Sequence, residues 1–255
     1  MIRKRLIGVV TVRDGWAVQS FGYGRYLPLG RPEVLVENLD RWGADEVLLQ
    51  CIDRGTRGPD LDLLARISAL GLATPLIYAG GIRDAADATA VVAAAADRVV
   101  IDALLHDDLS HVPRIAEQLG SQAVIAALPL SRVDGALKWL DHRDGSERPL
   151  DPAVIQLLAD CVISEALVID WRHEGTPGSF DATLLDGVAP DHVPLIAFGG
   201  LSAPEDLADV LGRPHVAAAA IGNFLSYEEH AVQRYKAALA ALPLRPAAYH
   251  RTQYA

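Results

Sequence analysis

An internal repeat of about 120 residues is the feature that most constrains the fold of this chain. One match pairs PLIYAGGIRDAADA, from Pro75, with PLIAFGGLSAPEDL, from Pro194, at an offset of 119. A second pairs RGTRGPDLDLL, from Arg54, with EGTPGSFDATLL, from Glu174, at an offset of 120. A half of this size cannot bury its own apolar faces, so we expect two similar halves to close on each other.

Short β-branched runs alternate along the chain with longer segments of helical periodicity. Most runs lack polar–apolar alternation, which is typical of parallel strands covered on both faces. Three helical segments open with a proline, at Pro32, Pro152 and Pro204, a residue favoured in a first helical turn. The predicted strands are Arg5–Val12, Glu46–Ile52, Leu76–Ala79, Arg98–Asp102, Ala123–Leu128, Ala166–Asp170, Pro194–Phe198 and Val216–Ile221. Eight strands, each followed by a helix, predict an α/β fold, a single (β/α)8 TIM barrel.

We expect one domain over residues 1–255, made of half-barrels at about 1–120 and 121–245. No linker or low-complexity segment divides the chain, and 51% of its residues are hydrophobic, enough for a large core. The last segment, 246–255, follows Arg245 in the stretch RPAAYHRTQYA, and we expect it to be a loosely held tail.

Charge and composition exclude several classes of protein. A net charge of −10 argues against a surface for nucleic acid or anionic membranes, which needs clustered Lys and Arg. The opening MIRKRLIGVV has too short an apolar run for a signal peptide, and no run approaches the ~20 residues of a membrane span. Cys51 and Cys161 form no disulfide framework and no zinc pattern. We expect a soluble, cytoplasmic protein.

Glycine-rich loops follow the sixth, seventh and eighth predicted strands. Loops at this face of a barrel commonly bind phosphate through backbone N–H groups. The candidate residues are Gly175, Thr176, Gly199, Gly200, Gly222 and Asn223. The alternative is that these glycines only permit tight turns. In the other half, AGGIRD offers Gly81, but Asp102 at the end of the fourth strand would repel a phosphate there.

Carboxylates at strand ends are candidates for acid–base chemistry. They are Asp53, Asp102, Asp170 and Glu174. Catalysis of this kind needs two groups that face each other with separated pKa values. The alternative for each is a helix cap or an ion pair with Arg54, Arg83 or Arg172. The eight histidines lack metal-ligand spacing, so we predict no metal site.

The opposite barrel end is predicted to collect charges of alternating sign. Arg5, Glu46, Arg98 and Glu165 open the first, second, fourth and sixth strands. The amino ends of barrel strands converge, so the four side chains should meet. On residue types alone they form a salt-bridged plug.

These residues lie in segments that resemble a known family. From KRLIGVVTVRDG through GADEVLL, AGGIRD, AADRVVI, GSQAVIAALPLSRVDG, EGTPGSFD and IAFGGLS, the chain resembles the cyclase subunit of imidazole glycerol phosphate synthase. That family is a (β/α)8 barrel of histidine biosynthesis. Its cyclase takes ammonia from a glutaminase subunit docked at the barrel bottom, through a charged gate. The resemblance implies that Arg5, Glu46, Arg98 and Glu165 are this gate, with Arg98 in place of a lysine.

The same resemblance exposes departures at the top of the barrel. The positions of the family's two catalytic aspartates hold Thr11 and Pro129, and neither side chain transfers protons near pH 7. Its first phosphate site, usually Asn-Thr, reads Asp102-Ala103, and a lysine of the strand-one loop appears as Gln19. The second phosphate site is better kept, as Glu174, Gly175, Gly200 and Gly222.

The leading hypothesis is a cyclase-like barrel subunit of a glutamine amidotransferase. Such barrels accompany surface-polysaccharide amidotransferases, and YGRYLPLGRPE from Tyr23 is similar to that branch. A glutaminase would be the partner, a phosphorylated or sugar-nucleotide molecule the ammonia acceptor, and no cofactor is implied. One alternative is an active cyclase, a lyase, that uses Asp53, Asp102 or Asp170. Another is a non-catalytic scaffold that binds a phosphorylated ligand.

Overall fold

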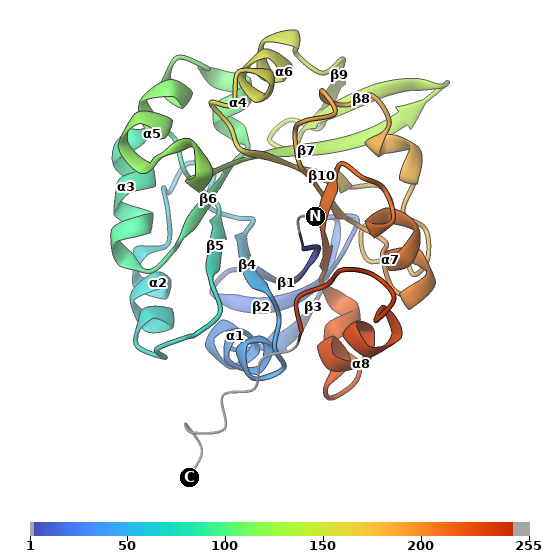
Figure 1. Ribbon diagram of the computed structural model, residues 1–255. Helices are drawn as coiled ribbons and strands as arrows, with labels where there is room; N and C mark the ends of the chain where they lie inside the picture. Colours follow the sequence, from blue (N-terminus) through green and yellow to red (C-terminus); the bar gives the residue numbers. More distant parts are fainter. Residues whose placement is uncertain (1–2, 247–255) are drawn as a thin grey trace.

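Eight parallel strands form a closed barrel in the computed structural model, which describes residues 3–246 (Figure 1). Neighbouring strands are hydrogen-bonded around the whole ring, and β12 beside β1 and β7 beside β10 complete the circle. The strands are β1 (Arg5–Arg13), β4 (Glu46–Cys51), β5 (Leu76–Ala79), β6 (Arg98–Ile101), β7 (Val124–Val133), β10 (Glu165–Asp170), β11 (Leu195–Phe198) and β12 (Val216–Ile221). The predicted (β/α)8 barrel is confirmed, and each strand lies within a few residues of its predicted bounds.

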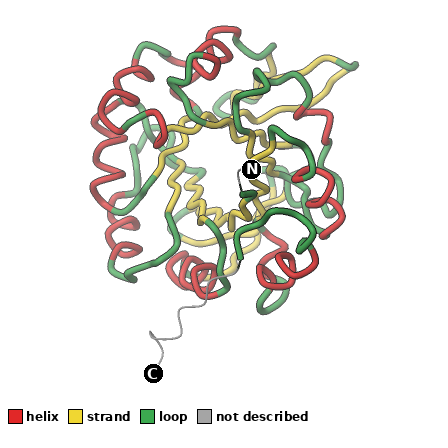
Figure 2. Tube along the Cα trace, viewed as in Figure 1, coloured by secondary structure: helices red, strands yellow, loops and turns green. Residues whose placement is uncertain are grey.

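Helices surround the strands, as Figure 2 shows in red around the yellow barrel. They are α1 (Pro32–Arg41), α2 (Leu61–Ser68), α3 (Ala85–Ala94), α4 (Ala103–Asp107), α5 (His111–Leu119), α6 (Pro152–Ala159), α7 (Pro204–Leu211) and α8 (Ala231–Ala238). Short 3-10 turns lie at η1 (Ser121–Ala123), η2 (Ala182–Leu185) and η3 (Asn223–Ser226). The expectation that every strand precedes an α-helix is wrong for β10, which only η2 follows before β11.

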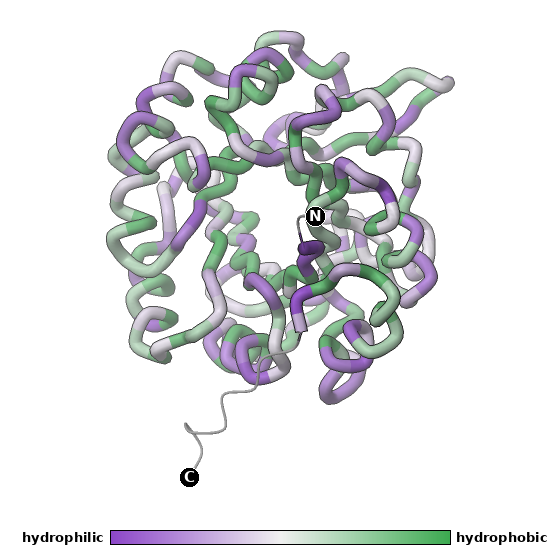
Figure 3. Tube along the Cα trace, viewed as in Figure 1, coloured by the Kyte–Doolittle hydropathy of each residue, from purple (hydrophilic) through white to green (hydrophobic). Residues whose placement is uncertain are grey.

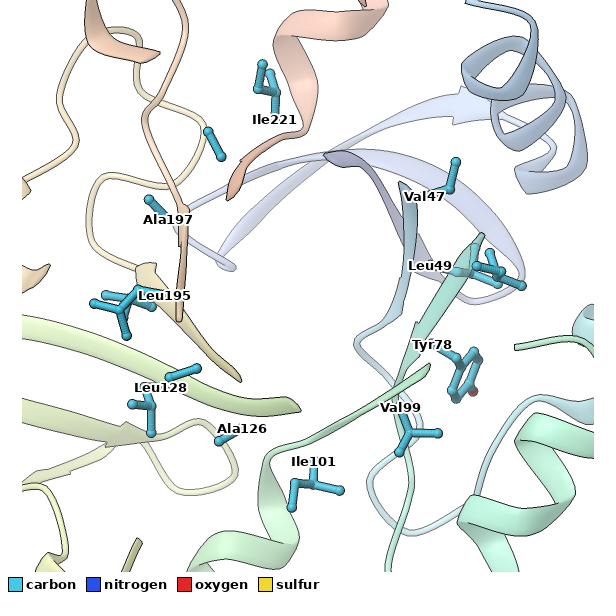
Figure 4. Close-up of a cluster of buried hydrophobic side chains, with 14 of the residues drawn as sticks. Val47, Leu49, Tyr78, Val99, Ile101, Ala126, Leu128, Leu195, Ala197 and Ile221 are labelled. Atoms are coloured by element: carbon cyan, nitrogen blue, oxygen red, sulfur yellow. The ribbon is translucent and has the colours of Figure 1, made fainter. Parts of the chain in front are cut away.

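Alternation along each strand divides the core into two clusters. Outward side chains pack against the helices, and Figure 4 shows ten labelled members of this cluster, including Val47, Leu49 and Tyr78. Inward side chains fill the barrel with residues such as Ile7, Leu48 and Leu167. The barrel strands are accordingly mostly hydrophobic, whereas many hydrophilic residues lie on the outer helices and loops (Figure 3).

Two antiparallel ribbons extend the barrel strands and were not predicted. After β1 the chain folds back as β2 (Trp16–Phe21) and β3 (Arg25–Gly30), referred to below as the first ribbon. After β7 it folds back as β8 (Ala136–Asp141) and β9 (Ser146–Arg148), the second ribbon. Because β7 continues to Val133, Pro129 lies inside that strand, opposite Ile169, and not just beyond a strand ending at Leu128.

The predicted tail lies almost wholly outside the residues that the structure describes. Of the segment 246–255, all but Pro246 lies outside the described residues. None of the described helices is long and apolar enough to cross a membrane.

Candidate functional site

Four charged side chains form a ring at the amino end of the barrel strands. The Nη2 atom of Arg5 lies 2.7 Å from Oε1 of Glu165, and its Nη1 lies 3.1 Å from Oε2 of Glu46. Nη1 of Arg98 lies 2.9 Å from Oε2 of Glu165 and 3.6 Å from Oε1 of Glu46. The ring Arg5–Glu46–Arg98–Glu165 is therefore closed by ion pairs, as the strand starts predicted.

Burial and mutual attraction set the charges of this ring. Burial opposes the charge of Arg5, but attraction to Glu165 and Glu46 outweighs it and raises the pKa of Arg5. Burial raises the pKa of Glu46 against the opposing influence of Arg5 and Arg98. Arg98 also donates to the carbonyl of Gln122 and to Oγ of Ser164. Each cation thus has more than one acceptor, so the ring is held firmly.

The ring separates a surface hollow from the apolar barrel interior. Outside it lies an open cavity of about 420 Å³, bordered by the ring itself and by Asp97, Leu119, Gln122 and Ala123. Inside the ring, the residues two positions further along β1, β4, β6 and β10 are Ile7, Leu48, Val100 and Leu167. All four are buried in the interior cluster. A small neutral molecule that passes the ring would next meet only apolar side chains.

At the other end of the barrel, Thr11 and Pro129 offer no acid. Thr11 is buried on β1 opposite Gln50, and it borders a small cavity that also contacts Val9 and Asn223. Pro129 borders a different and larger cavity. The positions that the sequence resemblance assigns to catalytic aspartates are thus occupied by groups that cannot transfer protons.

The cavity beside Pro129 has a volume of about 240 Å³ and lies at the carboxyl ends of β4 to β7 and β10. It is called the large cavity below, to distinguish it from the small cavity beside Thr11. Its walls combine an apolar floor, aromatic rings and a few polar groups. The lining residues include Tyr23, Gln50, Arg54, Arg83, Val100, Asp102, Ala127, His142, Leu167 and Trp171. Gly81 and Pro129 also border it.

Asp102 is the one predicted acid on this cavity, and its partner is a histidine. Oδ2 of Asp102 lies 3.1 Å from Nδ1 of His142, which is in the turn between β8 and β9. The hydrogen bond that His142 donates to Asp102 raises the pKa of His142, and burial only partly offsets this. The other carboxylate oxygen, Oδ1, is buried without a hydrogen-bond partner within the described part of the chain.

Two of the other candidate acids, Asp53 and Asp170, do not border this cavity. Asp53 accepts from the backbone N–H of Asp14 and lies 3.5 Å from Arg57. Asp170 alternates with inward-facing Ile169, so its buried side chain points outward, where it accepts from Asp181 N–H and contacts His173 Nδ1 at 2.8 Å. Both carboxylates have local structural partners, but these are neither the helix caps nor the arginines Arg54, Arg83 and Arg172 of the alternative interpretation.

The first ribbon occupies much of the region where the second phosphate site was predicted. Buried Glu174 accepts from Oγ of Ser20 at 2.8 Å and from the N–H of Tyr23 at 3.4 Å. The Asn223 amide accepts from Ser20 N–H and donates to its carbonyl. Gly175, with φ of +79°, packs so closely against the Ser20 carbonyl that any side chain there would clash. Burial raises the pKa of Glu174.

The remaining glycine candidates lie beside this contact. Gly199 and Gly200 are buried after β11, and a side chain on Gly199 would meet the carbonyl of Asp170 at 2.5 Å. Gly222 faces the ring of Phe198, and exposed Thr176 donates its N–H to the carbonyl of His173. The structure therefore brings the predicted loops together, with the first ribbon as their immediate neighbour.

His142, Tyr23 and Trp171 are the cavity residues that the sequence did not predict. His142 follows Asp141 at the end of β8, and only the fold of the second ribbon brings it to Asp102. Tyr23 lies in the turn of the first ribbon and packs with Trp171 against the interior cluster. No group of three or more His, Cys, Asp or Glu residues within 3–246 has the geometry of a metal site.

Comparisons with known proteins give one consistent relationship. Residues 5–231 match the family model described as histidine biosynthesis protein. The chain is 30% identical over 247 residues to the imidazole glycerol phosphate synthase subunit HisF of Geobacillus thermodenitrificans, covering 94% of this chain and 97% of that one. It is 28% identical to putative HisF2 subunits of the same synthase from Vibrio vulnificus and Pseudomonas aeruginosa, covering 93% and 90% of this chain and 88% and 94% of theirs.

Proposed function

The chain belongs to the histidine biosynthesis protein family, a HisF-like barrel, and from that membership we propose that it is the ammonia-receiving subunit of a glutamine amidotransferase. A glutaminase would dock at the amino end of the barrel and release ammonia into it. The cyclase reaction would be absent, and the ammonia acceptor a phosphorylated or sugar-nucleotide molecule.

The observation that carries this proposal is the contrast between the ring and the two top positions. The ring Arg5–Glu46–Arg98–Glu165 has every charge paired at the point where ammonia would enter. Above it the lining is apolar, which admits neutral NH₃ and disfavours ammonium. Thr11 and Pro129 lack the acid–base groups that cyclisation requires.

A direct test mixes the chain with glutaminase subunits of its own organism and measures complex formation and glutamine hydrolysis. We expect an equimolar complex in which hydrolysis is accelerated at least severalfold over the free glutaminase. Charge reversal at the ring, as Arg5→Glu or Glu46→Arg, should abolish the delivery of glutamine nitrogen to any acceptor. If no glutaminase binds, or if both reversed variants transfer nitrogen normally, the proposal fails.

An active cyclase is the second candidate, because Asp102 remains on the large cavity with His142 beside it. The two candidates separate in one assay that supplies the family's ribonucleotide substrate with an ammonium salt and no glutaminase. The amidotransferase proposal expects no cyclised product from the folded chain. Turnover that is lost in Asp102→Asn would instead favour the cyclase.

A further inference from the structure

The large cavity contains an acid–base pair for which the ammonia route has no use. Asp102 is the residue before α4, and its side chain enters the cavity from the end of β6. His142 approaches from the second ribbon, with 3.1 Å between its Nδ1 and Oδ2 of Asp102. Because Nδ1 faces the carboxylate, Nε2 is the ring nitrogen left for another molecule.

The histidine is held in place by its neighbour Asp141, which is 3% exposed. Oδ2 of Asp141 lies 2.7 Å from Nη2 of Arg143 and 3.2 Å from Nη2 of Arg148. These ion pairs fix the turn between β8 and β9, in which His142 lies. A side chain whose backbone is fixed in this way can act with little loss of conformational entropy.

The lining describes the kind of molecule that the cavity would accept. Val100, Ala127 and Leu167 form an apolar floor, and Trp171 adds an aromatic wall. Gln50 adds an amide to the polar side made by Asp102 and His142. The volume of about 240 Å³ is below the roughly 300–1,000 Å³ of pockets for drug-sized ligands, so the molecule is small.

The charges of the cavity argue against an anion. Arg54 and Arg83 border it, but Arg54 lies 3.6 Å from Asp60 and Arg83 lies 3.0 Å from Asp87. Their charges are therefore balanced within the protein. The Asp102 carboxylate would repel a phosphate. Because Oδ1 is buried while the Asp102 side chain is 33% exposed, Oδ2 is the oxygen that reaches the cavity, and it has a further lone pair for a hydroxyl group.

We propose that this cavity binds a small neutral polyol and that Asp102 and His142 form its proton-transfer pair. Oδ2 of Asp102 accepts a hydrogen bond from one hydroxyl group, and Nε2 of His142 takes a proton from another. The imidazole then becomes imidazolium beside the Asp102 carboxylate, the ligand oxygen keeps its electron pair, and the reverse step returns the proton. This inference stands on the cavity alone and does not depend on a glutaminase partner.

The pair itself can be tested by NMR titration of histidine side chains. His142→Gln identifies the His142 signal by its loss. Asp102, Asp141 and Arg143 are the charged groups that act on His142, with His106 and Arg148 close to Asp141. In Asp102→Asn the His142 midpoint should fall toward or below the ordinary value of about 6.5. His111, which lies 3.6 Å from Asp108, is the matched control and should not move.

The ligand class is tested with two probes on the intact chain, myo-inositol and inorganic phosphate. We expect inositol, but not phosphate, to shift the His142 signal saturably, and Asp102→Ala to lose at least tenfold in inositol affinity. A circular dichroism spectrum and melting curve establish that each variant is folded, and Asp102→Asn is used if the alanine variant is not. A response to phosphate alone, a response to neither probe, or an unchanged His142 midpoint in Asp102→Asn would overturn the proposal.

Discussion

At the amino end of the barrel, each of four charged side chains is ion-paired with two others, whereas at the carboxyl end Asp102 has one imidazole as its partner and a side chain that is 33% exposed beside a cavity. The two ends bury charge at different costs. The closed ring offsets the desolvation of its charges with four ion pairs, while the Asp102 carboxylate keeps hydrogen-bonding capacity toward the cavity. Exposure of a hydrogen-bonding carboxylate to a cavity distinguishes the candidate binding site from the closed ring, since both ends contain a buried oxygen without a hydrogen-bond partner in the described chain, Oε2 of Glu46 and Oδ1 of Asp102.

Removing a charge from the ring should give the largest effect of those considered. Glu165→Ala deprives both Arg5 and Arg98 of their nearest carboxylate, at 2.7 and 2.9 Å. Breaking a buried pair from one side costs about 3–5 kcal/mol, because an uncompensated charge stays buried. We expect a loss of that size in the free energy of unfolding, measured with urea. The exposed Glu117→Ala is the control, and a loss below about 1 kcal/mol for Glu165→Ala would show that the ring is solvated.

Breaking the contact between the first ribbon and the loop after β10 should lower the free energy of unfolding by less than the loss expected for Glu165→Ala. Glu174→Ala leaves the Ser20 hydroxyl and the Tyr23 N–H without their acceptor in a buried setting. An unsatisfied buried group costs about 1–3 kcal/mol, so we expect about 2 kcal/mol in urea unfolding. Cleavage by trypsin at Arg25, in the exposed part of β3, should also accelerate. Glu174→Gln keeps an acceptor and is the matched control, expected to lose less than half as much.

The sequence predicted the barrel strands well because their burial on both faces leaves continuous apolar runs, such as VAAAAI in β12. It missed both ribbons. In RYLPLG of β3 the side chains are mostly exposed, so no core face marks the strand. The helix expected after β10 is absent because the segment before β11 forms only the turn Ala182–Leu185.

For the site, strand position predicted the ring and the presence of Asp102, since both follow from where each strand begins and ends. The side chain of Asp170 points to the outer side of β10, and for this reason it does not reach the cavity inside the barrel mouth. His142 could not be predicted. It lies 40 positions after Asp102, and only pairing of β7 with β8 brings the two together.

A third prediction concerns His106, a buried imidazole near Asp102 with neither ring nitrogen hydrogen-bonded in the described chain. Its ring stacks on Trp139 at 3.7 Å, and burial lowers its pKa. In the unfolded chain the His106 imidazole becomes protonated near pH 6.5, but in the folded chain it becomes protonated only at lower pH. Wild-type stability should therefore fall as the pH drops below about 6.5, until the folded pKa is reached.

His106→Phe keeps the stacking and removes this penalty. From about pH 7.5 to about pH 5, its free energy of unfolding should rise relative to that of the wild type, by less than the loss in Glu174→Ala. Urea titrations at several pH values measure the difference, with the exposed His192→Gln as control. A difference that is independent of pH would mean that His106 is protonated equally in both states.

Arg98→Lys gives the smallest expected effect and separates charge from geometry at the ring. Lysine keeps the positive charge beside Glu165 but loses the donors that Arg98 directs to the Gln122 carbonyl, at 3.0 Å, and to Ser164 Oγ, at 3.1 Å. Gln122 borders the open cavity outside the ring and Ser164 is half-buried, so water can replace the lost donors. We expect a loss of about 1 kcal/mol or less in urea unfolding.

The same variant should leave binding of the glutaminase and transfer of glutamine nitrogen within about twofold of the wild type, because the alternation of charge survives. A loss above about 3 kcal/mol would mean that the planar guanidinium, and not its charge, holds the ring, since lysine cannot reproduce that fork of donors. A stable variant that no longer transfers nitrogen would instead give the guanidinium itself a part in passage. In either case the charges of the ring alone would not explain its stability or its function. The ring would then depend on the hydrogen-bond geometry of particular groups, as the cavity around Asp102 does.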